Sequence, residues 1–300
     1  MPNLKSIKRK ISSIKNTRQI TRAMKMVAAS KLKKNQSAMN EYKAYAKAYG
    51  DAVKNISTNT ILYSHPFFKG YEALNNAKNA SNTGIIIIST DRGLCGSFNL
   101  NLFKLFLETI HSKELNLNIS GHKIQLYITG KKGLDFFKKS AYDIAFGMSY
   151  YEEGSPDRLS AILSDNISND FVENKMKEVY IISNSYVSTM QQKAAAEKIL
   201  PIGSDNAGAN KKSGGYLIEP AEYEQEIIDK IFKDYIKTKI YFKILESFAG
   251  EQAARMIAMD NATRNAGRLI NKLTVSYNKA RQAAVTLEIL DIINGANAIK

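Results

Sequence analysis

The sequence predicts an α/β protein built from a long antiparallel two-helix coiled coil, formed by the N- and C-terminal segments, with an α/β domain inserted between them. Heptad spacing of apolar residues near both ends indicates the coiled coil. Short apolar runs that alternate with helical segments in the middle of the chain indicate a sheet covered by helices. With 300 residues, the chain is long enough for two domains of the usual size of about 150 residues.

The N-terminal segment, residues 1–60, is expected to form one helix of the coiled coil. Residues 3–57 contain no proline and a single glycine, Gly50, and are rich in Ala, Lys, Leu and Gln, which favours a helix. A narrow apolar stripe follows spacings of three and four residues through Leu4, Ile7, Ile11 and Ile14. The same face, slightly rotated, is expected to continue through Ile20, Met24 and Val27.

The C-terminal segment, residues 220–300, is expected to form the second helix, with Pro220 at its start, where a helix tolerates proline. Its seam alternates spacings of four and three residues through Met259, Thr263, Ala266, Ile270, Leu273, Tyr277, Ala280, Ala284 and Leu287. Helices this long, rising about 1.5 Å per residue, extend far beyond a small domain. They therefore need a long partner, and each is expected to be the other's.

The central segment, residues 80–200, is expected to form the inserted α/β domain. Its short apolar runs predict buried strands at 84–90, 123–130 and 178–187. Intervening segments predict helices at 99–113, 131–139 and 156–174. The polar, glycine-rich stretch 203–215 is expected to be a mobile loop, and residues 203–219 form a separate loop segment before the second long helix.

Charge and cysteine content narrow the possible classes of protein. Lys and Arg total 43 against 28 Asp and Glu, a net charge of +15, which favours an acidic protein, a nucleic acid or an anionic membrane as partner. One cysteine, Cys95, excludes an intrachain disulfide and fits a reducing compartment. The N-terminus lacks the apolar core of a signal peptide, and the sequence has no apolar stretch of 18 residues that could span a membrane.

The best candidate for a catalytic loop is STDRGLCGSFN, residues 89–99, which follows a predicted strand. It has neither the P-loop nor the dinucleotide-binding pattern, so a tight turn in which Asp91 or Asn99 caps backbone amides is favoured. The three histidines, which lack metal-ligand spacing, are His65, His111 and His122. We therefore expect no catalytic residue, no metal site and no cofactor in this chain.

The first forty residues are strongly basic, and their first acidic neighbour is Glu41. The cations are Lys5, Lys8, Arg9, Lys10, Lys15, Arg18, Arg22, Lys25, Lys31, Lys33 and Lys34. A solvated face and a nucleic-acid-binding surface are both compatible with such a run. Single-stranded nucleic acid needs interleaved aromatic residues, and the first aromatic is Tyr42, so an acidic protein surface is the simpler partner.

Three separated motifs resemble the gamma subunit family of F-type ATP synthases. They are IKRKISSIKNTRQITRAMKMVAASKL at 7–32, DRGLCGSFN at 91–99, and a C-terminal region at 251–298 that contains RMIAM, NATRNAG and YNKARQAA. The residues that fill the family's C-terminal signature are Thr286, Glu288, Asp291, Gly295 and Ala296. Two departures are Arg264, where an acidic residue is common, and Ser97, where a second glycine is common.

The resemblance implies a Rossmann-like inserted domain and a non-catalytic rotor of the central stalk. Such a rotor transmits torque between the membrane c-ring and the catalytic alpha/beta hexamer, so that ion flow is coupled to ATP synthesis or hydrolysis. It would contact the alpha, beta and epsilon subunits and reach the membrane only through the c-ring. The implied location is peripheral, at the cytoplasmic face of the bacterial plasma (inner) membrane.

The resemblance also implies contact residues. Those matching the beta-subunit contacts are Arg22, Met24, Lys25, Arg255, Arg281, Gln282 and Thr286. Those matching the foot that meets the c-ring and the epsilon subunit are Tyr216, Ile218 and Glu219. The apolar tail, residues 287–299, is suited either to ordinary core packing or to an apolar sleeve in which it could turn, because burial without directional bonds allows rotation. The alternatives are a basic coiled-coil nucleic-acid-binding protein and an α/β enzyme with helical arms.

Overall fold

The computed structural model describes residues 4–56, 65–69, 82–111, 123–149, 155–173, 175–202 and 224–298. The chain divides into two compact units: Met1–Ser30 with Arg255–Lys300, called the helical unit, and Lys31–Ala254, called the α/β unit. Two long helices, α1 (Leu4–Ile56) and α7 (Glu224–Ala298), contribute to both units. The predicted loop and foot at 203–219 lie outside the described residues.

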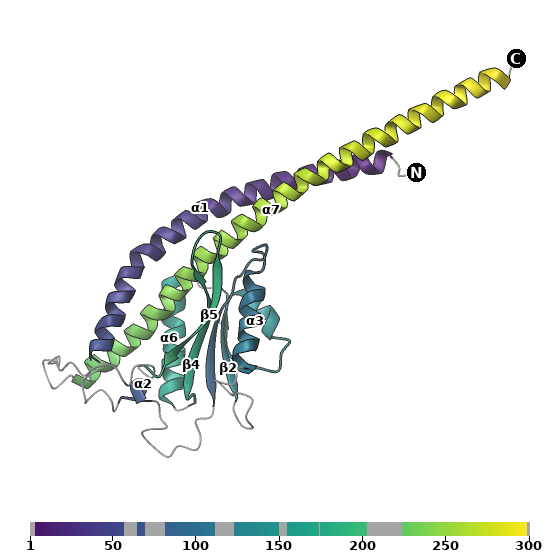
Figure 1. Ribbon diagram of the computed structural model, residues 1–300. Helices are drawn as coiled ribbons and strands as arrows, with labels where there is room; N and C mark the ends of the chain where they lie inside the picture. The colour runs from purple at the N-terminus through teal and green to yellow at the C-terminus, as the bar shows by residue number, and fades with distance from the viewer. Residues whose placement is uncertain are drawn as a thin grey trace. The chain divides into compact units, whose positions relative to one another are not determined.

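The α/β unit contains a five-stranded sheet with strand order β3-β2-β1-β4-β5 (Figure 1). The strands are β1 (Thr83–Ile88), β2 (Ile124–Thr129), β3 (Asp143–Met148), β4 (Glu178–Tyr186) and β5 (Gln192–Leu200). The first four run parallel, and β5 pairs antiparallel with β4. This is the mixed α/β arrangement that the alternating strands and helices predicted.

Three of the five strands were predicted, and the two edge strands were missed. Strand β3 is half exposed along its length, so it lacks the continuous apolar run of a buried strand. Strand β5 has the sequence QKAAAEKIL, whose Ala, Lys and Glu residues favour a helix. It becomes a strand because β4 offers it a hydrogen-bonding edge over eight paired positions. A tertiary contact therefore overrides the local preference.

Helices cover both faces of the sheet (Figure 1). Their bounds are α2 (Pro66–Lys69), α3 (Phe98–His111), α4 (Lys131–Phe137) and α6 (Pro156–Val172). The start of α6 is set by sequence: Ser155 accepts a hydrogen bond from the Arg158 backbone N–H at 3.3 Å, and proline occupies the first turn. The predicted helices at 99–113, 131–139 and 156–174 are confirmed within a few residues.

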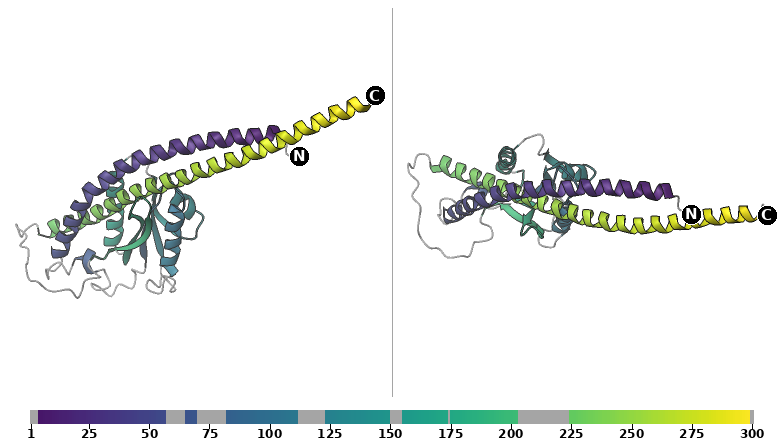
Figure 2. Two further views of the ribbon diagram at one scale, coloured as in Figure 1. Left: turned by 45° about the horizontal axis from the view of Figure 1, so that its top comes forward. Right: turned by 90° about the horizontal axis from the view of Figure 1, so that it is seen from above.

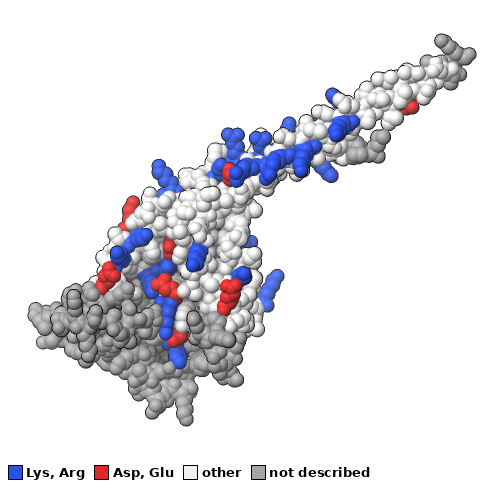
Figure 3. Space-filling view, in the orientation of Figure 1, with Lys and Arg blue, Asp and Glu red and all other residues white. Residues whose placement is uncertain are grey.

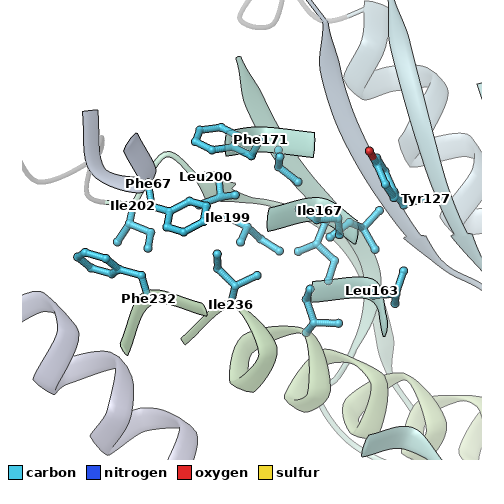
Figure 4. Packing of buried hydrophobic residues seen from close by; sticks show 14 of the residues in the cluster. Phe67, Tyr127, Leu163, Ile167, Phe171, Ile199, Leu200, Ile202, Phe232 and Ile236 are labelled. Atoms are coloured by element: carbon cyan, nitrogen blue, oxygen red, sulfur yellow. The ribbon is translucent and has the colours of Figure 1, made fainter. Parts of the chain in front are cut away.

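The isoleucine run of β1 supplies side chains to both faces of the sheet. Ile85 and Ile87 pack with α3 and α4, whereas Ile86 and Ile88 pack with α6 and α7, and all four are fully buried. Alternate residues of a strand point to opposite faces, so an unbroken apolar run requires cover on both sides. Figure 4 shows the α6–α7 side, where Phe232 of α7 lies close to the buried residues around Phe67.

In the α/β unit, α1 and α7 lie side by side in antiparallel directions. The rings of Tyr42 and Tyr241 meet edge to face with centroids 4.6 Å apart. The side-chain amide of Asn35 donates to the Phe248 carbonyl oxygen at 3.3 Å. Since residues earlier in α1 contact residues later in α7, the predicted antiparallel pairing of the terminal helices is confirmed.

An ion-pair cluster joins α7 to the edge strand β5. The Glu197 carboxylate lies 2.9 Å from the Lys239 ammonium and 3.1 Å from that of Lys243. Lys243 also lies 3.3 Å from Glu246. Burial by itself raises the pKa of the Glu197 carboxyl, but the two lysines more than offset this effect, so its pKa lies below the usual value of 4.5.

This cluster predicts a pH dependence of stability. Because folding lowers the Glu197 pKa, the carboxylate contributes stability above its unfolded pKa, and that contribution is lost as the pH falls through its folded pKa. We expect Glu197→Gln to be less stable than the wild type at pH 7 and to lose less stability between about pH 5 and pH 3. Urea unfolding at several pH values measures this, with exposed Glu226→Gln as control. Parallel pH profiles for Glu197→Gln and wild type would contradict the assignment.

Candidate functional site

The helical unit is an antiparallel pair of helices whose facing residues are identified by two polar contacts (Figure 2). The Thr263 hydroxyl donates to the Thr21 hydroxyl oxygen at 2.8 Å. One turn along, the Lys25 ammonium lies 2.6 Å from the Asp260 carboxylate. Extending this register toward the N-terminus of α1 places Leu4 opposite Ala280. Beyond that point α7 continues without an α1 residue opposite it.

The predicted seam of α7 is confirmed over most of its length. Met259, Ala266 and Ile270 are buried. The half-buried seam positions are Thr263, Leu273, Tyr277, Ala280 and Ala284. Leu287, however, is 45% exposed, so the predicted last position is wrong. It lies past the start of α1, and no described residue of α1 can cover it.

The predicted seam of α1 is correct at its start and wrong farther on. Ile7 is buried, and Ile11 and Ile14 are half-buried. Ile20 and Val27, which were expected to continue the seam, are instead 60% and 57% exposed. Their neighbours Thr21 and Ala28 take the seam positions and are buried. Thr21 and Ala28 keep the seven-residue spacing from Ile7 and Ile14, so α1 continues to face α7 without rotation.

The residues matched to beta-subunit contacts form two groups along the helical unit. In the first, Arg22 is exposed, Met24 is half-buried, and Lys25 is paired with Asp260. Arg255 is buried, with 8% of its surface exposed, and belongs to this end of the pair. Arg255 and Arg281 lie on one continuous helix, about 39 Å apart at about 1.5 Å per residue. A single loop therefore cannot contact both.

The second group lies near the C-terminal end of α7. Arg281, Gln282 and Thr286 are all exposed, and the Thr286 hydroxyl donates to the Gln282 carbonyl oxygen at 2.9 Å. Their side chains are therefore available to a partner on the outside of the helix. The signature residues Glu288, Asp291 and Gly295 are likewise exposed, and Ala296 lies in the same helix with its side chain outside the described part.

The C-terminal end of α7 exposes apolar side chains on more than one face of the helix. They are Val285, Leu287, Ile289, Leu290, Ile292 and Ile293. Such a concentration of exposed apolar side chains marks a binding surface in a folded protein. The predicted foot residues Tyr216, Ile218 and Glu219 lie outside the described residues.

The helical unit is strongly basic (Figure 3). Its described residues include fourteen Lys and Arg against three acids, which are Asp260, Glu288 and Asp291. Asp260 is shared between Lys25 and Arg264, whose guanidinium lies 3.2 Å from it. Arg264, one of the two departures from the family pattern, therefore stabilises an acid that already pairs with the other helix. The remaining cations leave the surface positive and suited to an acidic partner.

The loop after β1 forms the tight turn that the sequence favoured, and it has no nucleotide-binding pattern. The Asn99 side-chain oxygen accepts from the Thr90 backbone N–H at 3.2 Å, and Asp91 accepts from the Lys131 backbone N–H at 2.8 Å. Cys95 is buried, and its sulfur accepts a hydrogen bond from the Asn99 side-chain amide at 3.6 Å. Sequence reasoning missed Leu94, which adopts a φ of 63° although it is not glycine.

Across the described ranges, no group of three or more His, Cys, Asp or Glu side chains is arranged to hold a metal ion. None of the helices in those ranges is long and apolar enough to cross a bilayer.

Comparison with known proteins identifies the family. The family model for ATP synthase matches residues 3–299. The ATP synthase gamma chain of Histophilus somni (strain 129Pt) is 39% identical over 303 residues, and that of Chlorobaculum tepidum is 35% identical over 300 residues. Each match covers 100% of both chains.

Solved structures have the same fold. A chain from the Euglena gracilis mitochondrial ATP synthase matches with a TM-score of 0.69 at 19% identity, covering 99% of this chain and 94% of that one. A chain from the Tetrahymena thermophila mitochondrial ATP synthase central stalk and c-ring matches with a TM-score of 0.58 at 24% identity, covering 81% and 99%. Because gamma chain relatives that are 35% to 39% identical match this chain over its full length, the chain belongs to the ATP synthase gamma chain family.

Proposed function

We propose that this chain is the central-stalk rotor subunit of an F-type ATP synthase. It transmits torque between the membrane c-ring and the catalytic alpha/beta hexamer, so that ion flow is coupled to ATP synthesis or hydrolysis. The observation that carries the proposal is the match of residues 3–299 to the ATP synthase family model, together with full-length gamma chain relatives at 35% to 39% identity. In this role the nucleotide chemistry would take place on other subunits of the complex. The nucleic-acid-binding alternative has no support in the fold or family of the chain.

The helical unit has the physical properties that such a rotor needs. Two paired helices are stiff, and their surface differs on every side, so a surrounding ring of similar subunits meets different side chains at each position. A rotor biases a catalytic site only through contacts that differ between the states of that site. The exposed cations Arg22 and Arg281 are suited to acidic loops of the beta subunits, since arginine can bind a carboxylate through two parallel hydrogen bonds.

The apolar end of α7 suits a bearing. Its exposed side chains include Ile289, Ile292 and Ile293. Apolar contact has no preferred direction, so a sleeve formed by the alpha and beta subunits can bury this end without holding it at one angle. The foot around Tyr216, Ile218 and Glu219 is assigned to the c-ring and the epsilon subunit by family resemblance. The chain would then be peripheral, at the cytoplasmic face of the bacterial plasma membrane.

Replacing Arg281 by alanine tests the rotor contact. Arg281 is exposed on α7, so its loss should leave folding nearly unchanged, within about 0.5 kcal/mol. In the assembled complex, we expect ion pumping per ATP hydrolysed to fall several-fold, because a charge-assisted contact to the beta subunit is lost. Inverted membrane vesicles allow both ATP hydrolysis and ATP-driven ion pumping to be measured.

Two variants control this experiment. Arg268→Ala removes another exposed arginine of α7, whose guanidinium donates to Asn265, and should leave coupling intact. Arg281→Lys keeps the charge but not the two-pronged geometry and should have an intermediate effect. Wild-type coupling in Arg281→Ala would remove Arg281 from the mechanism. Failure of the tagged chain to co-purify with alpha and beta subunits would refute the rotor function itself.

A further inference from the structure

The helical unit contains a local conflict between burial and hydrophobicity. Ile20 and Val27 are about 60% exposed, while Thr21, directly after Ile20, is only 9% exposed. Successive residues of an α-helix point about 100° apart. Turning α1 locally by one residue would therefore bury Ile20 and Val27 against α7 and expose Thr21 and Ala28. Apolar burial within residues 20–28 alone favours the turned arrangement.

Residues outside this stretch favour the observed arrangement. Ile7 and Ile14 precede Thr21 at seven-residue intervals, and Ala28 follows at the same interval. The turned alternative has no apolar continuation toward the N-terminus, because Ser13 and Thr17 would occupy its seam. The conflict is therefore confined to about two turns of α1, and polar contacts within those turns can decide it.

Two polar pairs exist only in the observed arrangement. The hydroxyl of Thr263 lies 2.8 Å from that of Thr21, and the Lys25 ammonium lies 2.6 Å from Asp260. The hydrogen bond from Lys25 lowers the pKa of Asp260 below its usual value, because it stabilises the carboxylate. Arg264 holds the other carboxylate oxygen of Asp260 at 3.2 Å, which fixes the orientation of the acid.

We infer that Thr21, Lys25, Asp260 and Thr263 set the rotational position of α1 about its own axis across residues 20–28. Polar pairs at seam positions of a coiled coil specify one arrangement among several that apolar packing would allow. Here they keep Ile20, Arg22 and Val27 on the outside of the helical unit. The four residues would then position Arg22 for its contact with a beta subunit. This consequence rests on the proposed rotor function.

Cysteine labelling of the full chain can measure this rotational position directly. Val27→Cys reports the exposed side of α1, and Ala28→Cys reports the seam, where Ala28 is 1% exposed. The native thiol, Cys95, is 3% exposed and is distinguished by mass spectrometry of its peptide. With no other substitution present, a maleimide should modify the thiol introduced at position 27 faster than the thiol introduced at position 28 under identical conditions.

The deciding variant is Lys25→Glu, which replaces attraction to Asp260 by repulsion and keeps high helix propensity. We expect labelling to slow at position 27 and to quicken at position 28. The ratio of the two labelling rates should change about fivefold, which is the size of effect expected when an attractive ion pair at a partly exposed site is replaced by a repulsive pair. Lys25→Glu combined with Asp260→Lys should restore the original ratio. Lys15→Glu, the same charge change at an exposed position of α1, should leave it unchanged.

Opposite changes at the two reporters distinguish rotation from loss of structure, which would quicken both. Asp260→Asn, which keeps the side-chain volume, provides a milder variant and should shift the ratio in the same direction by a smaller factor. The inference would be overturned if the ratio of labelling rates did not change, or if labelling quickened equally at both positions in Lys25→Glu and in Asp260→Asn. It would also be overturned if Lys25→Glu combined with Asp260→Lys did not restore the original ratio. The labelling needs no ATP, so its failure would leave the rotor proposal, which Arg281→Ala tests, standing.

Discussion

Gly130→Ala is expected to lower the free energy of unfolding of the α/β unit by about 3 kcal/mol, combining a left-handed backbone penalty of about 1–2 kcal/mol with overpacking of about 1–3 kcal/mol. Gly130 has a φ of 92°, and a Cβ atom there would overlap the Ser89 carbonyl group. The backbone at Ser89 and at Gly130 cannot shift freely to relieve this overlap, because both residues are held by hydrogen bonds. The Ser89 N–H donates to the Thr129 carbonyl oxygen at 2.9 Å, and the Gly130 N–H donates to the Met148 carbonyl oxygen at 2.8 Å.

Gly267→Ala is a matched control, for which we expect a change in the free energy of unfolding of the opposite sign. Gly267 lies inside α7, and a Cβ atom there would have no neighbour within 4 Å. Alanine in a helix interior is more stable than glycine by about 0.5–1 kcal/mol, so Gly267→Ala should stabilise the helical unit. Urea unfolding followed by circular dichroism measures both variants. A Gly130→Ala protein as stable as the wild type would mean that the turn after β2 differs from the structure.

Phe232→Ala should cost about 3–5 kcal/mol, the usual loss for an aromatic side chain removed from a packed core. Phe232 of α7 is 1% exposed and packs in the same cluster as Phe67 and Phe171, with its ring 4.9 Å from that of His65 (Figure 4). Removing it leaves a cavity between α7 and the elements that cover the sheet. The expected result is early loss of the α/β unit in denaturant.

Two comparisons make this prediction specific. Phe232→Leu keeps most of the apolar volume and should lose clearly less stability than Phe232→Ala. Phe136 is 45% exposed although it stacks on Phe103, so Phe136→Ala should lose only about 1 kcal/mol. Equal losses for Phe232→Ala and Phe136→Ala would show that α7 does not pack on the sheet as described. Hydrogen exchange of β4 and β5 amides can localise the effect.

Parts of the fold that depend on local pattern were predictable. The two long helices follow from helix-favouring composition and heptad spacing, and β1, β2 and β4 follow from apolar runs that need cover on both faces. Edge strands β3 and β5 were not, because β3 is half exposed and β5 has helix-forming residues. Their conformation comes from pairing with a neighbouring strand, and no window of the sequence contains that information.

For the candidate site, the sequence predicts contact residues through family resemblance but not their arrangement. The resemblance indicates Arg22, Lys25 and Arg281 as contact residues, and this stays a prediction; in the structure Arg22 and Arg281 are exposed. Only the structure places Lys25 against Asp260, and only the structure buries Arg255. These differences concern residues far apart in sequence, and spacing along one helix cannot reveal which residue of the other helix lies opposite.

The amino-acid sequence by itself determined that this protein has two long terminal helices, a sheet-containing domain between them, a basic surface and membership of one family. The tertiary structure decided how α1 faces α7, leaving Ile20 and Val27 outside while Thr21 lies inside. Hydrophobicity near those residues favours the opposite choice. The observed choice depends on pairs such as Lys25 with Asp260, whose energy exists only when both helices are present.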